Sequence, residues 1–487
     1  MKSTNKSVQY FVALAVSLAA VSAGVTLTWT TTVIPKFHDN QTDFTLSDSE
    51  ISWIASISSP GFVVGSLASR FVSDRLGRRA TLQASALPMA VGTIIIISTA
   101  NVWLLCTSKF LWGVGAGMSG TVSAIYLAEI ADKEIRGSLS VLSRFMLNFG
   151  SFLTLLIGPF VSYYNLNYMI LSLPICYLIT CSLVPESPYF YLKEGKVGDA
   201  RKSLIRLRGN KGEKAVEDDL TAMRSDVTKE MRHSGSVKGF FTGKQYRKAL
   251  TIGVGLKMGQ VMSGTIVIQH YLGRIIQDSR YSIDLATVFI VFGALRFLVG
   301  VMSSVLADRV GRRPLLIVSF FGTGLSLTLV AVYFFCQEIL AFDQDHLSSY
   351  AVTVFIGIVL SSVISTLGYS SISYAILGEI FPLNVKSLAM TSLNIFGGSI
   401  NFLTTKSYQQ LKDVSGCFGV FCFFSSVSFV FAVFSYFVMP ETKGKSLGEI
   451  QVMVQGKYYD DSDVVSNATT VLVGNGTELK PMLDKKS

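Results

Sequence analysis

The chain has 487 residues, of which half are apolar and only 15% are charged, and its formal net charge is +10. This balance excludes a water-soluble protein of that length and fits a chain that is largely surrounded by lipid. The basic residues gather in short polar segments between apolar blocks, where orientation in a membrane requires them. The positive charge therefore does not indicate a nucleic-acid partner.

The first part of the chain contains six apolar blocks, at residues 8–34, 51–72, 81–100, 102–128, 139–163 and 166–184. Each has roughly 20 residues or more, enough at ~1.5 Å per residue to cross a hydrocarbon core of ~30 Å. Lipid offers the backbone no hydrogen-bond partner, so such spans must be helical. The first block is too long for the apolar core of a signal peptide, and we expect it to be a membrane helix.

A polar stretch at residues 185–247 follows, and then six more apolar blocks, at residues 249–272, 283–306, 315–336, 349–377, 388–408 and 416–439. The sequence therefore predicts an all-α membrane protein with 12 transmembrane helices in two six-helix bundles, joined by a linker. The expected domains are residues 1–184, 185–247, 248–440 and a tail at 441–487. The tail is polar after Tyr459 and we expect it to be largely disordered.

Lys and Arg are concentrated in the central stretch and in the loops after the second, fourth, eighth and tenth spans. The positive-inside rule then predicts that both termini and the central stretch are cytoplasmic. Asn40 begins an Asn-Gln-Thr sequon in a loop that this topology puts outside, so we expect it to be glycosylated. The six cysteines lack metal-site or disulfide-framework spacing, and no metal site is predicted.

The two halves of the chain carry a repeat. Residues 74–79 read DRLGRR after the second span, and residues 308–313 read DRVGRR after the eighth. Residues 129–137 (EIADKEIRG) are echoed by 379–387 (EIFPLNVKS), and PES at 185–187 by PET at 440–442. Repeats related by an axis along the membrane normal are typical of transporters in which two bundles move about a site at the midplane.

Glycine at Gly77 and Gly311 permits a tight turn, and the flanking charges can pair with carboxylates at neighbouring helix ends. We interpret these charges as a cytoplasmic gate that holds the bundles together on that side. The predicted gate residues are Asp74, Arg75, Arg78, Arg79, Glu129, Arg136, Glu186, Asp308, Arg309, Arg312, Arg313, Glu379 and Glu441. The alternative is that the basic residues only anchor the helix ends, but anchoring needs neither carboxylates nor glycines.

These motifs, with the segment PESPYFYLKEGKVGDARKSLIRLRG at 185–209 and PETKGKSLGEIQ at 440–451, resemble the sugar porters of the major facilitator superfamily. The similarity is greatest to the facilitated trehalose transporter-like branch and runs from about residue 24 to 451. The resemblance implies the major facilitator fold, a cytoplasmic helical linker domain at about 196–243, and alternating access. It implies a small-molecule substrate, a sugar, and neither enzyme activity nor a cofactor.

The departures from the family pattern lie where the family binds sugar. In the seventh span the motif QQLSGxNxxxYY keeps its first Gln as Gln260, but its Asn is Ile266. The Pro-x-Pro-Trp of the tenth span corresponds to residues 371–374, so the aromatic residue persists as Tyr374 while the proline hinge is lost. The Asn-Trp pair of the eleventh span falls on residues 397–398, which are both glycine.

Two further positions gain a charge, because Gln in the fifth span corresponds to Arg144 and Asn in the eighth to Arg296. A charge inside a membrane is costly and should face a cavity or a partner. In the functional interpretation both arginines line the cavity and favour an anionic or strongly hydrogen-bonding solute. In the alternative, Arg144 reaches the headgroups and Arg296 binds backbone carbonyls. The substrate-binding candidates are therefore Gln260, Tyr374, Arg144 and Arg296.

Proton-coupled members of the family carry an Asp in the first span, where this chain has Thr26. Without a buried carboxylate to titrate, the sequence predicts a uniporter in the plasma membrane that carries a sugar such as trehalose or glucose by facilitated diffusion. The alternatives are a transporter of another, possibly anionic, small solute, and a nutrient sensor that keeps the fold without transporting. The sequence gives no indication of the oligomeric state.

Overall fold

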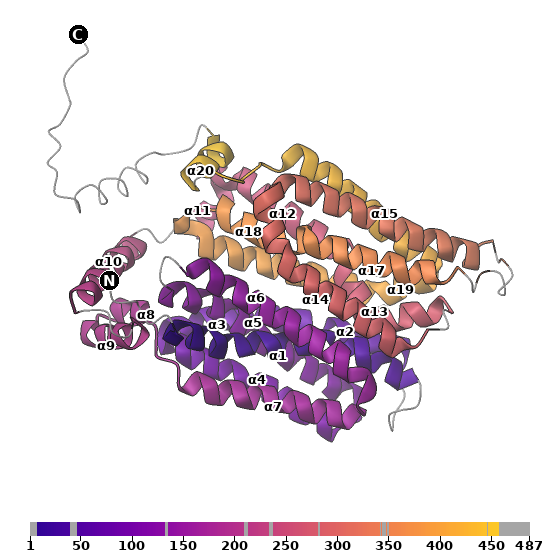
Figure 1. Cartoon of the computed structure of the whole chain (residues 1–487), viewed down its shortest axis with the longest axis horizontal. Helices are drawn as coiled ribbons and strands as arrows, with labels where there is room; N and C mark the ends of the chain where they lie inside the picture. Colours follow the sequence, from indigo (N-terminus) through magenta and orange to yellow (C-terminus); the bar gives the residue numbers. More distant parts are fainter. Residues whose placement is uncertain are drawn as a thin grey trace, which may run out of the picture.

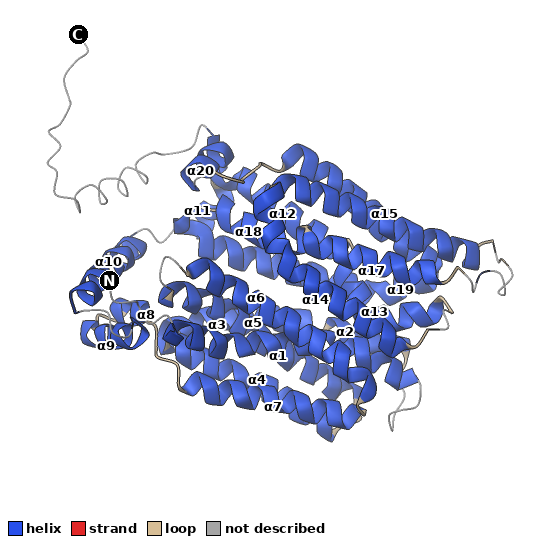
Figure 2. Cartoon of the chain, viewed as in Figure 1, coloured by secondary structure: helices blue, strands red, loops and turns tan. Residues whose placement is uncertain are grey.

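The structure is a computed structural model that describes residues 7–38, 46–131, 135–208, 213–232, 237–280, 283–340, 342, 347, 350–445 and 447–456. Figure 1 shows two groups of long helices lying side by side, and Figure 2 shows helix as the regular structure throughout the described chain. The glycosylation candidate Asn40 and the tail from residue 457 lie outside the described residues.

The N-terminal half is built from long apolar helices, joined by short turns, that pack against one another. Its α-helices are α1 (Ser7–His38), α2 (Asp48–Ser56), α3 (Ser58–Leu76), α4 (Arg78–Ser98), α5 (Val102–Ile130), α6 (Arg136–Ile157) and α7 (Tyr163–Ser182). The short 3-10 helix η1 (Gly158–Phe160) separates α6 from α7. Gly113 and Gly117 of α5 allow a close approach to α3, since a Cβ on either would lie 2.1–2.2 Å from a backbone carbonyl oxygen.

Four shorter helices form the linker: α8 (Pro188–Lys193), α9 (Val197–Arg208), α10 (Glu213–Arg232) and α11 (Val237–Thr242). Leu204, Leu220 and Val227 belong to an apolar core that α8, α9 and α10 share. Arg208 fastens the linker to the N-terminal half, because its Nη1 donates to the carbonyl oxygen of Ile130 at 3.2 Å. We call the end of the bundles beside α8–α10 the linker end, and the opposite end the far end (Figure 1).

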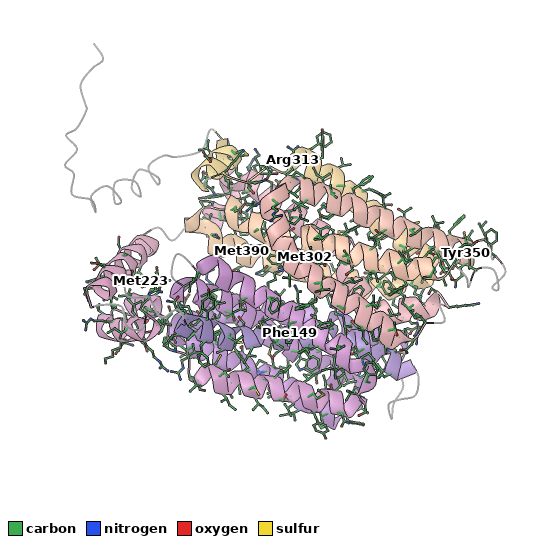
Figure 3. The ribbon with its side chains drawn as sticks, viewed as in Figure 1. Phe149, Met223, Met302, Arg313, Tyr350 and Met390 are labelled. Atoms are coloured by element: carbon green, nitrogen blue, oxygen red, sulfur yellow. The ribbon has the colours of Figure 1, made fainter. Side chains whose placement is uncertain are left out.

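The C-terminal half consists of η2 (Lys244–Tyr246), α12 (Arg247–Met262), α13 (Thr265–Asp278), α14 (Leu285–Val310), α15 (Arg312–Glu338), α17 (Val352–Leu367), α18 (Tyr369–Ile380), α19 (Leu383–Val438) and α20 (Leu447–Gln455). In Figure 3, Tyr350 marks its far end, and Met223 marks α10 beside the linker end.

Ten helical stretches of the described chain are long and apolar enough to cross a membrane. One of them, Leu388–Val438, has 51 residues and would be about 77 Å long, more than twice the hydrocarbon thickness. It consists of two limbs that meet at Gly416, whose φ of 67° is not helical. With α6, a further helix of 22 residues, the two limbs bring the total to the twelve predicted spans.

Large apolar side chains cover the outside of the bundles. Phe71, Leu298, Val430 and Phe437 are each more than half exposed. Contiguous apolar surface of this kind marks contact with lipid or a partner, and here it lies on helices of membrane-spanning length.

Two spans of the C-terminal half are broken near their middle, and these breaks position the site. The seventh divides at Gly264, which has a φ of 81° and separates α12 from α13. The tenth divides at Gly368, between α17 and α18. The family's prolines are absent from this span, and its break lies at Gly368. The Oγ of Ser319 accepts the N–H of Tyr369 beside the break.

Candidate solute site between the two halves

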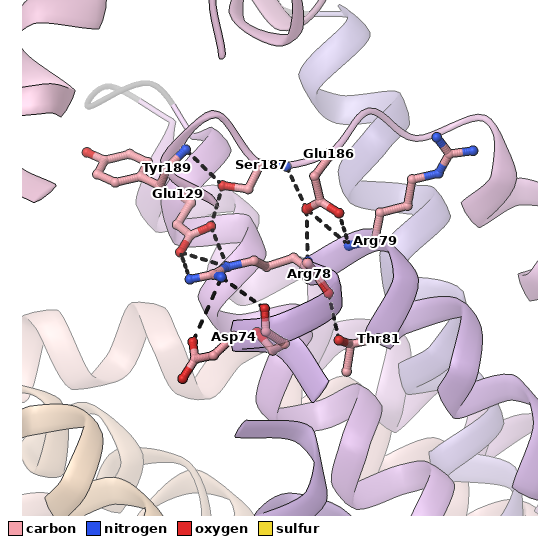
Figure 4. Close-up of polar contacts among 10 residues, drawn as sticks. Asp74, Arg78, Arg79, Thr81, Glu129, Glu186, Ser187 and Tyr189 are labelled. Carbon is pink, nitrogen blue, oxygen red and sulfur yellow. Dashed lines mark hydrogen bonds and ion pairs between the residues drawn. The ribbon is translucent and has the colours of Figure 1, made fainter. Parts of the chain in front are cut away.

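The repeated turns have the same geometry in both halves. Gly77 and Gly311 have φ values of 95° and 110°, a region that glycine alone adopts readily, and each directly precedes a helix, α4 or α15. A carboxylate meets each helix N-terminus. Glu186 accepts the N–H of Arg78 at 2.9 Å, and Glu441 accepts the N–H of Arg312 at 3.1 Å (Figure 4 shows the first). These carboxylates satisfy backbone donors that a helix start leaves free.

The N-terminal turn also holds a buried ion pair. The Arg78 guanidinium donates to Glu129, with Nη2 to Oε1 at 3.0 Å and Nε to both carboxylate oxygens at 3.2 Å (Figure 4). Asp74 lies 4.0 Å from the same guanidinium, and the hydroxyl of Ser187 donates to Glu129. The Arg78 side chain is 4% exposed, so water screens this contact little.

The C-terminal turn repeats the arrangement more loosely. Arg312 Nη2 lies 3.5 Å from Glu379 Oε1. Both side chains are more exposed than those of the pair between Arg78 and Glu129. Arg313 donates to the carbonyl oxygen of Tyr436 at 2.6 Å. The tighter contact belongs to the N-terminal half.

The two helix-start carboxylates differ in acidity. Burial raises the pKa of Glu186 above its ordinary value, although backbone N–H groups, among them that of Ser187, act against it. Burial also acts to raise the pKa of Glu441, but the N–H groups of Lys443, Arg312 and Arg313, among others, outweigh it and lower that pKa.

Each contact described above joins a gate residue to another residue of the same half of the chain, or to the linker segment that follows the N-terminal half. Arg79 donates to the carbonyl oxygen of Ser182, and Arg309 accepts a hydrogen bond from Lys443 at its own carbonyl oxygen. Arg75 is exposed, while the side chains of Arg136 and Asp308 lie outside the described residues. In this structure these contacts brace each half internally, and a gate between the halves stays a prediction.

Polar contacts join the two halves near the far end. Asp48 of α2 forms an ion pair with Arg274 of α13 at 3.2 Å. Four hydrogen bonds join the halves at the same end. Lys406 donates to Ser52 and Asn401 to Ser59, both at 2.7 Å. Thr31 donates to the carbonyl oxygen of Gln269 at 2.6 Å, and Thr30 and His270 share a hydrogen bond at 2.7 Å. These contacts hold the two halves together at the far end.

Nearer the linker end, Arg144 reaches from α6 into the C-terminal half. Its Nη2 donates to the carbonyl oxygen of Ser370, in the turn after the α17–α18 break, and its guanidinium lies 4.6 Å from the centre of the Tyr374 ring. The Lys257 ammonium lies 4.2 Å from the same ring. Although Tyr374 lies between the two halves, 40% of its surface is exposed, so it faces open space there. Gln260, one turn beyond Lys257, is half-buried.

Arg296 belongs to a second polar group. Its guanidinium donates to the Oε1 of Gln269, on α13. Both residues line a small cavity with Asn148 and Ser151 of α6, and this cavity has room for about one water molecule. Among the described residues, the Nε2 of Gln269 has no hydrogen-bond partner although the side chain is 1% exposed. The cavity therefore offers polar atoms from both halves.

The structure brings Arg144 and Tyr374 into contact and places Arg296 beside a cavity. Lys257, Gln269 and Asn148 were not among the substrate-binding candidates predicted from sequence. The signal for Lys257 was its position one turn before Gln260 on the same helix. Gln269 is an ordinary polar residue near a helix end, and only the turn at Gly264 directs it toward Arg296.

Two bundles of spans, broken helices beside the interface, and polar side chains between the bundles define a membrane transporter of the major facilitator fold. The chain belongs to the Sugar (and other) transporter family, whose family model matches residues 12–454. It is thus a multi-pass membrane protein and not an enzyme.

Two curated relatives are similar along most of the chain. The facilitated trehalose transporter Tret1 of Drosophila mojavensis and the trehalose transporter 1 of Drosophila melanogaster are each 30% identical over 460 residues. Each alignment covers 94% of this chain and 53% of the relative, so the chain spans about half the length of the curated relatives it matches.

Solved structures share the fold. A proton:xylose symporter, XylE, bound to 6-bromo-6-deoxy-D-glucose has a TM-score of 0.70 at 20% identity and covers 92% of this chain and 99% of its own. The xylose transporter XylE from E. coli in a partially occluded inward-open conformation has a TM-score of 0.72 at 20% identity, with 90% and 100% covered.

Proposed function

We propose that this chain is a facilitative uniporter that carries a sugar, such as trehalose or glucose, across a membrane by alternating access. The observation that supports this most is the group of polar side chains, Arg144, Lys257 and Tyr374, between the two halves. The far ends of the halves are joined by the partly exposed ion pair of Asp48 and Arg274. Polar contacts of this strength can break and re-form on binding, as alternating access requires.

In this proposal the solute binds between the bundles, at Gln260, Tyr374, Arg144 and Arg296. Opening the far end separates Asp48 from Arg274, and the charged turns at Gly77 and Gly311 then approach and close the linker end as the cytoplasmic gate. The expected domains, residues 1–184 and 248–440, act as the two moving bundles. The linker at 185–247 stays on the cytoplasmic side.

Uniport is proposed because the first span carries Thr26 where a titrating carboxylate would sit, and residues 8–37 contain neither Asp nor Glu. A proton-driven cycle needs a buried group that binds and releases the proton. The relatives named for trehalose transport support a sugar as the solute.

Counterflow in proteoliposomes tests the function. Vesicles loaded with unlabelled trehalose or glucose should accumulate the radiolabelled sugar transiently without a proton gradient, and an imposed proton gradient should not change the rate. Gln260→Leu should reduce the rate, whereas Lys248→Met, an exposed position outside the proposed site, should not. Saturable binding without counterflow would indicate a sensor instead, and loss of uptake without a proton gradient would contradict uniport.

Orientation has its own test. We propose that the linker and both termini are cytoplasmic in the plasma membrane. Asn40→Gln should then remove a glycan from protein expressed in a eukaryotic cell. Asn467 and Asn475 begin two further sequons in the tail, and Asn467→Gln and Asn475→Gln should leave the mass shift on deglycosylation unchanged. A glycan on the tail asparagines would reverse the assigned sides.

A further inference from the structure

Three cationic side chains share the space between the halves. Arg144 comes from α6, Lys257 from α12 and Arg296 from α14. Arg144 and Lys257 lie 4.6 Å and 4.2 Å from the centre of one ring, that of Tyr374. Arg296 lines the small cavity between the halves with Asn148 and Ser151 of α6. Positive charge therefore accumulates where the solute is proposed to bind.

The sequence supplies no carboxylate to neutralise this charge. Residues 137–185, 248–277, 285–307 and 351–378, which contain the three cations and Tyr374, include neither Asp nor Glu. Within the described part of the chain, these cations contact the ring of Tyr374, the carbonyl oxygen of Ser370 and the amide oxygen of Gln269, all of which are neutral. Uncompensated charge inside a membrane is costly, so an anion that enters this space gains from it.

The surroundings hold Lys257 in place. The side chain is 5% exposed, and a Cβ added at Gly397 of α19 would lie 3.3 Å from its Cδ, closer than most Cβ contacts. A larger residue at 397 would therefore push Lys257 away from Tyr374. The ring attracts both cations through its negative face and keeps them near one another without a ligand.

We propose that the transported solute is a sugar derivative that carries an anionic group, a carboxylate or a phosphate, and that this group binds between Arg144 and Lys257. The inference rests on the proposed function, uniport by alternating access, and replaces its neutral sugar with an anionic one. Arg144 belongs to the N-terminal half and Lys257 to the C-terminal half, so an anion held by both draws the halves together. The hydroxyl groups of the same solute can bind Gln260 and, beside Arg296, the free amide of Gln269.

Competition for binding tests the substrate class. Purified full-length protein is titrated with glucose, glucuronate and glucose 6-phosphate while its tryptophan fluorescence is followed, and the same three compounds compete with labelled glucose for uptake into proteoliposomes. Glucuronate should bind at least about tenfold more tightly than glucose, since a charge-assisted contact is stronger than a neutral one. Comparing the binding of glucuronate with that of glucose 6-phosphate shows whether a carboxylate or a phosphate fits the site.

Matched variants test the two cations. Arg144→Gln and Lys257→Met should each remove most of the preference for glucuronate over glucose, whereas Arg144→Lys and Lys257→Arg keep the charge and should retain part of it. Lys248→Met removes an exposed positive charge outside the site and should leave the preference unchanged. Because the ratio of two affinities is compared within one protein, a lower yield of folded variant does not change the result.

The outcomes separate the two claims. A tenfold preference for an anionic sugar that falls in both charge-removing variants supports the inference. Equal or tighter binding of glucose, unchanged in the variants, overturns the anionic solute and leaves the sugar uniporter standing. Binding of none of the three compounds overturns the anionic solute, and counterflow with trehalose then decides the proposed function.

Discussion

Asp48 of α2 and Arg274 of α13 form an ion pair at 3.2 Å between the two halves at the far end. Both side chains remain partly exposed, at 39% and 24%, so the pair contributes modestly, about 1 kcal/mol or less. A contact of this size biases an equilibrium between two conformations without locking it.

Asp48→Asn or Arg274→Gln should therefore shift the protein about two- to fivefold toward the state open at the far end. The shift can be measured as faster labelling of a cysteine placed between the halves near that end. Asp413→Asn is the matched control, since its carboxylate accepts from Gln409 of the same helix. Equal labelling rates in all three variants would exclude Asp48–Arg274 as a contact that closes the far end.

The repeated turns differ in how much each carboxylate contributes to stability. Glu129 accepts three hydrogen bonds from Arg78 within a buried group, whereas Glu379 lies 3.5 Å from Arg312 and, in the described structure, leaves its Oε2 without a hydrogen-bond partner. Glu129→Gln should cost about 3 kcal/mol and Glu379→Gln about 1 kcal/mol. The first variant should then show the larger fall in thermal unfolding midpoint in detergent. The reverse order would be inconsistent with the geometry.

Acidification should distinguish Glu186 from Glu441. The pKa of Glu186 is raised, so it takes up its proton above the ordinary range near 4.5, and the stability that protonation brings is lost as pH rises through that pKa. The pKa of Glu441 is lowered. Its ionised carboxylate therefore contributes to the stability of the fold above the ordinary pKa range, and this contribution is lost as pH falls through the pKa of Glu441 in the folded protein.

Infrared titration of the protonated carboxyl band measures the pKa values of Glu186 and Glu441. The difference spectrum between wild type and Glu186→Gln should contain a component that titrates above pH 4.5. The corresponding spectrum for Glu441→Gln should contain a component that titrates below it. Titration of both components at the same pH would argue against the different environments of the two turns.

The break at Gly264 should be sensitive to substitution. Its φ is 81°, and an added Cβ would lie 2.4 Å from the Phe424 ring. Gly264→Ala should therefore cost about 1–3 kcal/mol and slow transport, because it strains the turn between α12 and α13. Gly120→Ala serves as the control, since no atom of the described residues lies within 4 Å of a Cβ there. Wild-type transport and stability in Gly264→Ala would mean that the turn does not set the site.

Much of the fold could be predicted from sequence, because spans of about 20 apolar residues must be helices in lipid. The repeated turns put Arg78 and Glu129, which pair in the structure, in one group of candidate residues, but they did not predict which charges meet. Apolar length does not reveal where a span breaks, so Gly264 and Gly368 were not predicted as breaks. Arg144 was a candidate because its charge is unusual in a membrane, whereas Gln269 is polar and neutral and became apparent only from its contact with Arg296.

Paired distance measurements test alternating access most directly. Spin labels at Trp103 and Tyr350 report the separation of the halves at the far end, and labels at Leu76 and Val310 report it at the linker end; all four positions are exposed. Across solute additions and far-end variants, the two distances should change in opposite directions, one lengthening as the other shortens. A fixed distance at both ends, or lengthening of both together, would contradict two halves that open to one side at a time.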